Sequence, residues 1–167
     1  MPALDVEALV RDYARPIHAY LWRLLRDPSA AEDCLQDAFL QAAASAAKGE
    51  RIHHPRAWLY AVATNAANSY GRRLARGRER EQAMDSDLPD HASGVPEAAE
   101  RRERLRRVDE AVRRLPAKQR AALVMRKYQE LSYPEIGVAL GCSAASARAN
   151  VYQALRRLRT WLEEVDA

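Results

Sequence analysis

The sequence has few aromatic residues, two cysteines and no long apolar run. Aromatic side chains make up 7% of the 167 residues, and period-two runs of Val, Ile and Thr, which are typical of strands, are absent. No stretch of about 18 apolar residues is present, which excludes an ordinary membrane-spanning helix. The N-terminal stretch carries acids early, unlike a secretory signal with its basic end and apolar centre. We therefore expect an all-α, cytoplasmic protein without direct membrane insertion.

The cysteines and histidines do not form a recognisable metal or disulfide pattern. Cys34 and Cys142 lie far apart and outside any C-x-x-C motif, which favours small buried side chains over a disulfide or a zinc site. His53 and His54 are adjacent in a predicted loop, which is not the spacing of two ligands on one helix face. We expect no metal site and no cofactor.

Charge is arranged in blocks, although the formal net charge is only +4. Residues 1–50 carry 5 basic and 8 acidic side chains, and residues 51–80 carry 7 basic and 1 acidic. Residues 81–100 carry 6 acidic side chains and no basic one, whereas residues 101–167 carry 15 basic and 8 acidic. Two basic segments on either side of an acidic one indicate two nucleic-acid-facing modules joined by a tether.

The acidic segment is predicted to be that tether. Glu81–Ala98 contains Pro89, Gly94 and Pro96 and has no apolar periodicity. Such a segment cannot bury enough surface to offset its ordering entropy, so we expect a flexible linker over residues 81–104. A solvated connector is the simplest interpretation of its charge.

The C-terminal segment has the pattern of a helix-turn-helix. Ser132-x-x-Glu135 is a capping box that begins one helix, Gly141 is suited to end it with a positive φ, and Ser143 is suited to cap the next. An apolar stripe marks the buried side of the second helix: Val151, Ala154, Leu155, Leu158 and Leu162. The opposite side carries Arg148, Tyr152 and Arg156, with Asn150 and Gln153 beside them, and no acid occurs from residue 141 to 162. Arginine and amide side chains can read base edges, which favours a DNA reader over a solvated basic face.

The N-terminal segment offers two further candidate surfaces. The predicted helix Ala31–Ala43 has Leu35, Phe39 and Ala42 on one face and acidic or amide side chains on another: Glu32, Asp33, Gln36 and Asp37. That second face suits a basic protein surface, and a solvated face is the alternative. A second predicted helix begins with an apolar stripe around Trp58 and ends in five arginines within residues 72–80. Arginines interleaved with aromatic and amide side chains are typical of single-stranded nucleic-acid binding, although Trp58 also fits a core position.

Three segments in this order, AEDCLQDAFL, HPRAWLYAVATNAANSYGRR and LPAKQRAALVMRKYQELSYPEIGVALGCSAASARANVYQALRRLR, resemble a bacterial RNA polymerase sigma factor of the extracytoplasmic-function (ECF, sigma-70 family) type. The resemblance covers nearly all of the chain except the linker. It implies a region 2 domain at residues 1–80, a linker at 81–104, and a region 4 helix-turn-helix domain at 105–167.

The resemblance also implies partners and residue roles. Core polymerase is expected to bind through its largest-subunit coiled coil and its flap, the coiled coil contacting Asp33, Gln36 and Asp37. The downstream promoter element (−10) is expected to be melted and read by His53, His54, Arg56, Asn65, Arg72 and Arg73. The upstream element (−35) is expected to be read by Ser143, Ser146, Arg148, Ala149, Tyr152, Gln153 and Arg156. Family members are often restrained by an anti-sigma factor, which can hold them at the inner membrane.

Several positions depart from the family pattern. Ala43 stands where a tryptophan is frequent, Ser69 where an acid is usual, and Gly71 where an apolar residue is usual. In the recognition helix, Ala147 replaces a usual valine, Ala149-Asn150 a small polar and basic pair, and Gln153 a frequent arginine. These differences bear on the promoter sequence that is read.

The residues alone leave other functions open. An autonomous helix-turn-helix regulator would use the N-terminal segment as a dimerisation or sensing domain, although the acidic patch is more polar than a dimer interface should be. A third alternative is a sigma-mimic, a protein that binds a regulator of sigma factors without driving transcription. Such mimics usually carry an additional signalling domain. An enzyme acting on nucleic acid is disfavoured, because no catalytic constellation accompanies the paired carboxylates.

Overall fold

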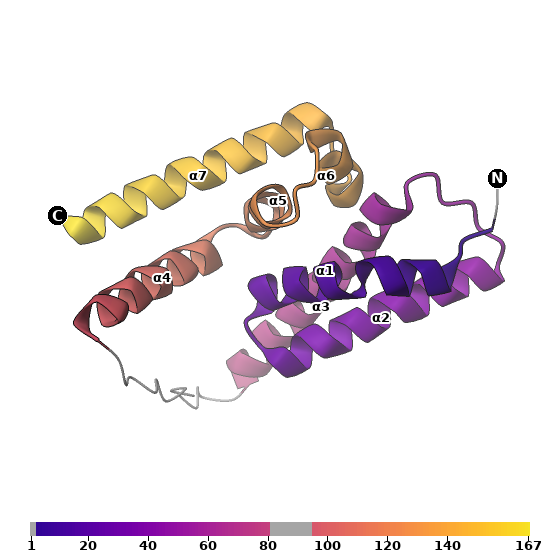
Figure 1. Cartoon of the computed structure of the whole chain (residues 1–167), viewed down its shortest axis with the longest axis horizontal. Coiled ribbons are helices and arrows are strands. Elements are labelled where there is room, and N and C mark those ends of the chain that lie inside the picture. Colours follow the sequence, from indigo (N-terminus) through magenta and orange to yellow (C-terminus); the bar gives the residue numbers. More distant parts are fainter. Residues whose placement is uncertain (1–2, 81–94) are drawn as a thin grey trace.

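The computed structural model describes residues 3–80 and 95–167. These residues form seven helices and no strand: α1 (Val6–Leu25), α2 (Pro28–Ala47), α3 (Pro55–Arg80), α4 (Pro96–Arg114), α5 (Ala117–Lys127), α6 (Tyr133–Leu140) and α7 (Ala144–Asp166). Helices α1 to α3 form one group and α4 to α7 a second (Figure 1). The prediction of an all-α protein with two small helical domains is confirmed.

The first two helices are joined by a tight turn that local side chains specify. Arg26 takes the left-handed conformation at φ 52°, and its N–H donates to the Trp22 carbonyl at 2.8 Å. The Asp27 carboxylate then caps α2 by accepting from the N–H groups of Ser29 and Ala30. The Tyr70 hydroxyl donates to the same carboxylate at 3.1 Å, which ties α3 to this corner.

Small side chains make the buried face of α2. Ala31, Cys34, Ala38 and Ala42 are buried there. Leu35 and Phe39, predicted to form the buried stripe, only pack partly against the core, and the apolar face is therefore rotated relative to the prediction. Alanines allow α1 and α3 to approach α2 closely, and this close packing decides which face turns inward.

The predicted helix-turn-helix forms as expected. The Ser132 hydroxyl accepts from the Glu135 N–H, and the Glu135 carboxylate accepts from the Ser132 N–H at 2.8 Å, which completes the capping box. Gly141 ends α6 at φ 67°, and Ser143 caps α7 by accepting from the Ser146 N–H. On α7 the buried residues are Ala147, Val151, Ala154 and Leu158, whereas Leu155, predicted for the buried stripe, is 37% exposed.

Helix α4 begins inside the segment predicted to be a linker. We expected a flexible linker through residue 104, yet residues 96–104 are helical. Pro96 occupies the first turn, where its missing N–H costs little, and Glu97 favours the positive end of the helix dipole. Pairs three and four residues apart join Glu103 to Arg106 and Arg107. Residues 81–94 of the predicted linker lie outside the described residues.

The two groups of helices pack against each other. Helix α3 lies against α6, and α1 lies against α5 (Figure 1). Their buried side chains form one continuous cluster that runs from Tyr20 and Leu59 in the first group to Met125 and Ile136 in the second. Among the described helices, none combines the length and the apolar character that crossing a membrane requires.

Candidate nucleic-acid and partner interfaces

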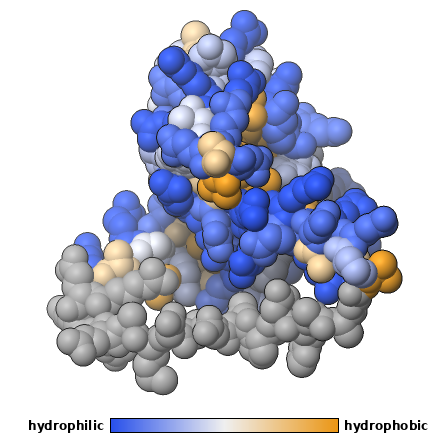
Figure 2. All heavy atoms as spheres, turned by 90° about the vertical axis from the view of Figure 1, so that its left-hand side faces the viewer, coloured by the Kyte–Doolittle hydropathy of each residue, from blue (hydrophilic) through white to orange (hydrophobic). Residues whose placement is uncertain are grey.

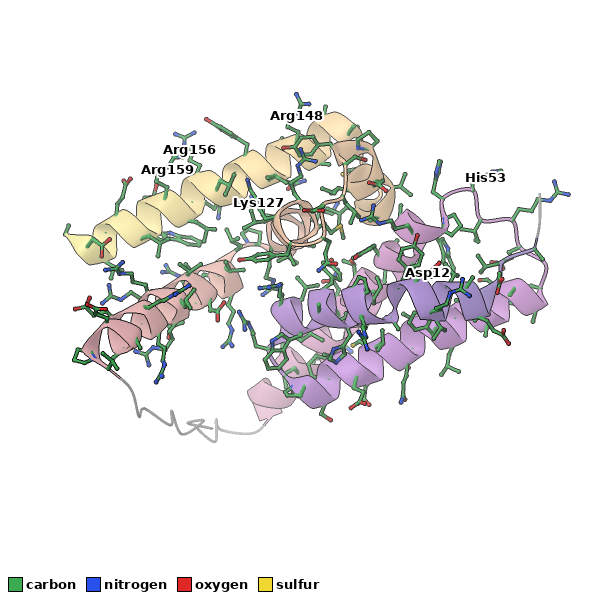
Figure 3. The ribbon with its side chains drawn as sticks, in the orientation of Figure 1. Asp12, His53, Lys127, Arg148, Arg156 and Arg159 are labelled. Carbon is green, nitrogen blue, oxygen red and sulfur yellow. The ribbon has the colours of Figure 1, made fainter. Side chains whose placement is uncertain are left out.

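The solvent-facing side of α7 carries the side chains predicted to read DNA. Arg148, Tyr152, Gln153 and Arg156 are exposed there. Figure 3 shows Arg148 and Arg156, with Arg159, extending from α7 away from the other helices. The apolar residues on the opposite side of α7 hold this surface in place because they are buried against α5 and α6.

An aromatic ring from the preceding helix supports the first of these arginines. The Arg148 guanidinium lies 5.0 Å from the centre of the Tyr133 ring, and the Arg126 guanidinium lies 4.3 Å from it. Such cation–π contacts restrict the long arginine side chain before any ligand arrives. Tyr133 was not among the residues predicted from the sequence, although an aromatic residue on the first turn of α6 was a usable signal.

Of the remaining residues predicted to read DNA, at the N-cap and along α7, several already make side-chain hydrogen bonds within the chain. The Gln153 side-chain oxygen accepts from the amide nitrogen of buried Gln119 at 3.1 Å, which leaves the Gln153 amide nitrogen as a donor. The Ser143 and Ser146 hydroxyls hydrogen-bond to each other at 3.0 Å, so both are engaged at the helix cap. Ala149 is exposed and offers only a methyl group.

The acidic face of α2 is exposed as predicted. Asp33, Gln36 and Asp37 all lie on the outer side of the helix. Cys34 points inward between them, and burial, together with the nearby charge of Asp37, raises the pKa of its thiol. This face can therefore accept basic groups, while the cysteine belongs to the core.

The residues predicted to contact the −10 element are spread along α3 and the loop before it. His53 and His54 are exposed in that loop, and Figure 3 shows His53 directed to solvent. Asn65 is also exposed and lines a cavity of about 290 Å³, which α5 and residues Val138–Gly141 line from the other side. Arg72 and Arg73 are exposed further along α3.

Arg56 is hydrogen-bonded to the second group of helices. Its Nη1 donates to the Glu135 carboxylate at 3.1 Å, and its Nη2 donates to the Gln129 backbone carbonyl at 2.9 Å. One turn further along α3, the Tyr60 hydroxyl donates to the Gln129 side-chain oxygen at 2.6 Å. This arrangement could not be predicted from the sequence, because it joins residues more than 65 positions apart.

The Glu135 carboxylate is electrostatically suited to hold Arg56. Partial burial raises the pKa of this carboxyl. Hydrogen bonds from the Ser132 backbone and hydroxyl, together with the charge and hydrogen bond of Arg56, lower the pKa by more than burial raises it. The result is a pKa below its ordinary value of 4.5, so Glu135 remains ionised near neutral pH.

Two more contacts join the groups at the end of α1. The Arg23 guanidinium lies 3.7 Å from the centre of the Tyr128 ring, and Arg26 forms an ion pair with Asp109 of α4.

The face that presents the free ends of α4 and α7 is predominantly hydrophilic, with only small hydrophobic spots (Figure 2). Over the described ranges, no group of three or more His, Cys, Asp or Glu side chains is placed to hold a metal ion.

Comparison with known proteins agrees with this architecture. Residues 9–77 match the family described as Sigma-70 region 2, and residues 105–158 match Sigma-70, region 4. The chain is 32% identical to the RNA polymerase sigma-E factor of Streptomyces antibioticus, over 98% of this chain and 87% of that protein. It is 30% identical to the ECF RNA polymerase sigma factor SigL of Mycobacterium tuberculosis, over 96% of this chain and 90% of that protein.

Solved structures share the fold. The sigma factor RpoE from Bartonella quintana, solved in complex with the anti-sigma factor NepR, superposes with a TM-score of 0.70 at 21% identity, covering 94% of this chain and 96% of that one. CnrH, solved with the cytosolic domain of CnrY, superposes with a TM-score of 0.65 at 20% identity, covering 95% and 88%.

Two helical domains of these families, with an exposed recognition helix, define a transcription-initiation subunit. The chain belongs to the extracytoplasmic-function group of the sigma-70 family of RNA polymerase sigma factors. It binds core RNA polymerase and directs promoter recognition, DNA melting and initiation of transcription. The comparisons give no support to the alternative of an autonomous regulator.

Proposed function

We propose a division of labour within this sigma factor in which three surfaces take three ligands. Residues 1–80 act as the region 2 domain, residues 81–104 connect, and residues 105–167 act as the region 4 domain. The helical start of α4 is then the ordered end of the connection. The chain provides positioning and binding free energy and has no catalytic role, since the polymerase performs the chemistry.

The acidic face of α2 docks the polymerase. Asp33, Gln36 and Asp37 are exposed together on a helix whose other side is buried. Carboxylates presented in this way suit a basic helical surface such as the coiled coil of the largest subunit, and the flap is the proposed partner of the region 4 domain.

The loop before α3 and the outer side of α3 melt and read the −10 element. His53, His54 and Asn65 provide hydrogen-bonding groups for unpaired bases. Arg56, Arg72 and Arg73 provide cations for the backbone of the displaced strand. Arg56 must exchange its carboxylate partner for DNA to do so.

The exposed face of α7 reads the −35 element, and this face is the observation that carries the proposal. A capped, acid-free helix presents Arg148, Tyr152, Gln153 and Arg156 to solvent on one side. Arginine can pair bidentately with guanine, and the methyl group of Ala149 can contact thymine. Ser143 and Ser146, at the N-terminus of the helix, are placed for phosphate contacts.

A regulatory partner is proposed as well. The two solved relatives described above are complexes, one with the anti-sigma factor NepR and one with the cytosolic domain of CnrY. Their fold matches this chain over more than nine-tenths of its length. We propose that an anti-sigma protein binds this chain too, and that the chain acts in the cytoplasm, where polymerase and promoters are found.

Run-off transcription tests the proposed function. Bacterial core polymerase is incubated with fragmented genomic DNA from the source organism, with and without this protein. Discrete transcripts that require the protein are expected, and alignment of their start sites yields the −10 and −35 sequences. If no such transcript forms while the protein alone shifts specific duplexes, the proposal fails in favour of autonomous regulation.

Replacing the first recognition arginine should weaken upstream recognition. Arg148→Ala removes a base-reading guanidinium, and we expect a loss of about 1–3 kcal/mol in binding to the −35 element. Competition of the holoenzyme between promoter fragments measures this loss. Binding to core polymerase, measured separately, should be unchanged, and its loss would contradict the role given to α7.

A further inference from the structure

The buried amide of Gln119 is a feature that the proposed function leaves unexplained. Gln119 lies in the first turn of α5 and is only 7% exposed, although amide side chains are mostly found at the surface. Among the side chains that the structure describes, its Oε1 is the one buried nitrogen or oxygen without a hydrogen-bond partner. A buried polar atom without a partner costs free energy, so stability alone does not explain a glutamine at this position.

The amide nitrogen of Gln119 has its partner on the recognition helix. Nε2 of Gln119 donates to Oε1 of Gln153 at 3.1 Å, across the contact between α5 and α7. Gln153 itself is exposed, on the side of α7 proposed to face DNA. One amide is therefore held in the core and the other at the surface, and the bond between them connects the interior to the −35 surface.

This bond also selects one orientation of the Gln153 amide. If both amides were turned over, Gln153 would donate to Gln119, and the Gln119 nitrogen would be buried without any partner. Proteins tolerate a buried oxygen without a partner more readily than a buried N–H group without one. The observed orientation is therefore the favoured one, in which the Gln153 oxygen is turned to α5 and its nitrogen is left for a ligand.

An amide held in this way suits a different base from a free amide. A free glutamine pairs with adenine through both of its ends, because its oxygen accepts from N6 and its nitrogen donates to N7. When Gln119 occupies the oxygen of Gln153, the two N–H groups of the nitrogen remain, and they match the N7 and O6 acceptors of guanine. Arg156 and Arg157 line a hollow of about 420 Å³ together with Gln153. These arginines can hold backbone phosphates, so the amide is not needed for that contact.

We propose that Gln119 is a positioning residue for promoter recognition, which makes Gln153 a hydrogen-bond donor and thereby a reader of guanine rather than adenine in the −35 element. This inference deepens the proposed function and rests on it, because it takes Gln153 as a base-reading residue. Gln119 acts only through Gln153, since its own side chain is buried.

Three variants separate the hydrogen bond of Gln119 from its contribution to packing. Gln119→Met removes both polar atoms and keeps an unbranched side chain of similar length, so the Gln153 amide is released. Gln153→Ala removes the reading group and identifies the base position that it contacts. The control Val124→Ala shortens another buried side chain of α5, one without a polar atom, so it lowers stability without acting on the amide pair.

Selection among promoter fragments with a randomised −35 element tests the proposal. Holoenzyme is assembled from bacterial core polymerase and the full-length chain, and the bound fragments are sequenced. At the position whose preference is lost in Gln153→Ala, we expect the wild type to favour guanine. Gln119→Met should lower the guanine-to-adenine ratio there by roughly three- to tenfold, the value of about one hydrogen bond, and leave the other positions unchanged. Val124→Ala should keep the wild-type ratio.

The possible outcomes separate this inference from the proposed function. A wild-type preference for adenine, an unchanged ratio in Gln119→Met, or an equal change in Val124→Ala overturns the inference and leaves the proposed function standing. If Gln153→Ala alters no position, the inference and the −35 role of Gln153 both fail, whereas Arg148→Ala still tests α7 separately. Failure of the wild type to select any −35 sequence contradicts the proposed function itself. If circular dichroism shows that Gln119→Met is poorly folded, Gln119→Leu replaces it, with the same change in ratio expected.

Discussion

At the scale of single residues, the glycines show how closely the helix-turn-helix is packed. A Cβ atom added to Gly137 would lie 2.7 Å from the Cys142 backbone carbonyl oxygen, closer than real side chains allow. The neighbouring atoms belong to the backbone of the turn, which cannot move aside cheaply. A Cβ atom added to Gly71, in the exposed part of α3, would meet no atom within 4 Å outside the neighbouring backbone of its own helix. Identical substitutions at these two glycines should therefore have opposite effects.

Gly137→Ala should destabilise the protein by about 1–3 kcal/mol, because the added methyl group overpacks α6 against the turn. Gly71→Ala should stabilise it by about 0.5–1 kcal/mol, because alanine is favoured over glycine inside a helix. Urea unfolding followed by circular dichroism measures both changes. Equal effects of the two substitutions would contradict the packing described for Gly137.

At the scale of helices, the caps of α6 and α7 could be predicted from the sequence, whereas the buried face of α2 could not. Caps are local, so Ser132, Gly141 and Ser143 could be assigned from neighbouring residues, and the structure confirms all three. The inward face of α2 could not be assigned in this way. Alanine is compatible with a core or a surface position, and the choice depends on how closely α1 and α3 approach.

Enlarging the buried face of α2 should be costly, and enlarging its outer face should not. Ala38 is fully buried, so Ala38→Leu should destabilise the chain by about 1–3 kcal/mol through overpacking. Ala43 is exposed, and Ala43→Trp, which restores the residue frequent in the family, should change stability by less than about 0.5 kcal/mol. Thermal unfolding measures both, and a tolerated leucine at position 38 would argue against this packing.

The candidate sites follow the same division between local and long-range information. The exposed residues of α7 were predictable, because a helical period places them opposite an apolar stripe. Those of α2 were predictable because charged and amide side chains are mostly exposed. The engagement of Arg56 by Glu135 was not, because only the packing of α3 on α6 brings residues 79 positions apart together. The contact of Tyr133 with Arg148 was missed for a similar reason, since it crosses the turn between two helices.

At the scale of the whole molecule, two tyrosines join the domains through one shared core. Tyr20 and Tyr60 are buried with their rings edge to face, 5.2 Å between centres. Tyr20 shares a 2.7 Å hydrogen bond with Thr64, and Tyr60 donates to Gln129 of the other domain. Burial raises the pKa of both hydroxyls, that of Tyr60 to about 12.

These raised pKa values predict an alkaline loss of stability. The unfolded chain gives up its tyrosine protons near pH 10.0, before the folded chain does, so unfolding is favoured as the pH rises from about 10 to about 12. The loss for each tyrosine is at most about 1.4 kcal/mol per pH unit. Urea unfolding at a series of pH values measures it, and Tyr60→Phe should reduce the slope. A wild type and a Tyr60→Phe variant with the same pH profile would contradict the prediction.

The Glu135 carboxylate takes part in two contacts at once. One oxygen of the Glu135 carboxylate accepts from the Ser132 N–H, and the other accepts from Arg56. The bond to Arg56 can therefore break while the helix cap stays intact. Arg56 can then exchange this carboxylate for another partner while α6 keeps its cap and its helical hydrogen bonds.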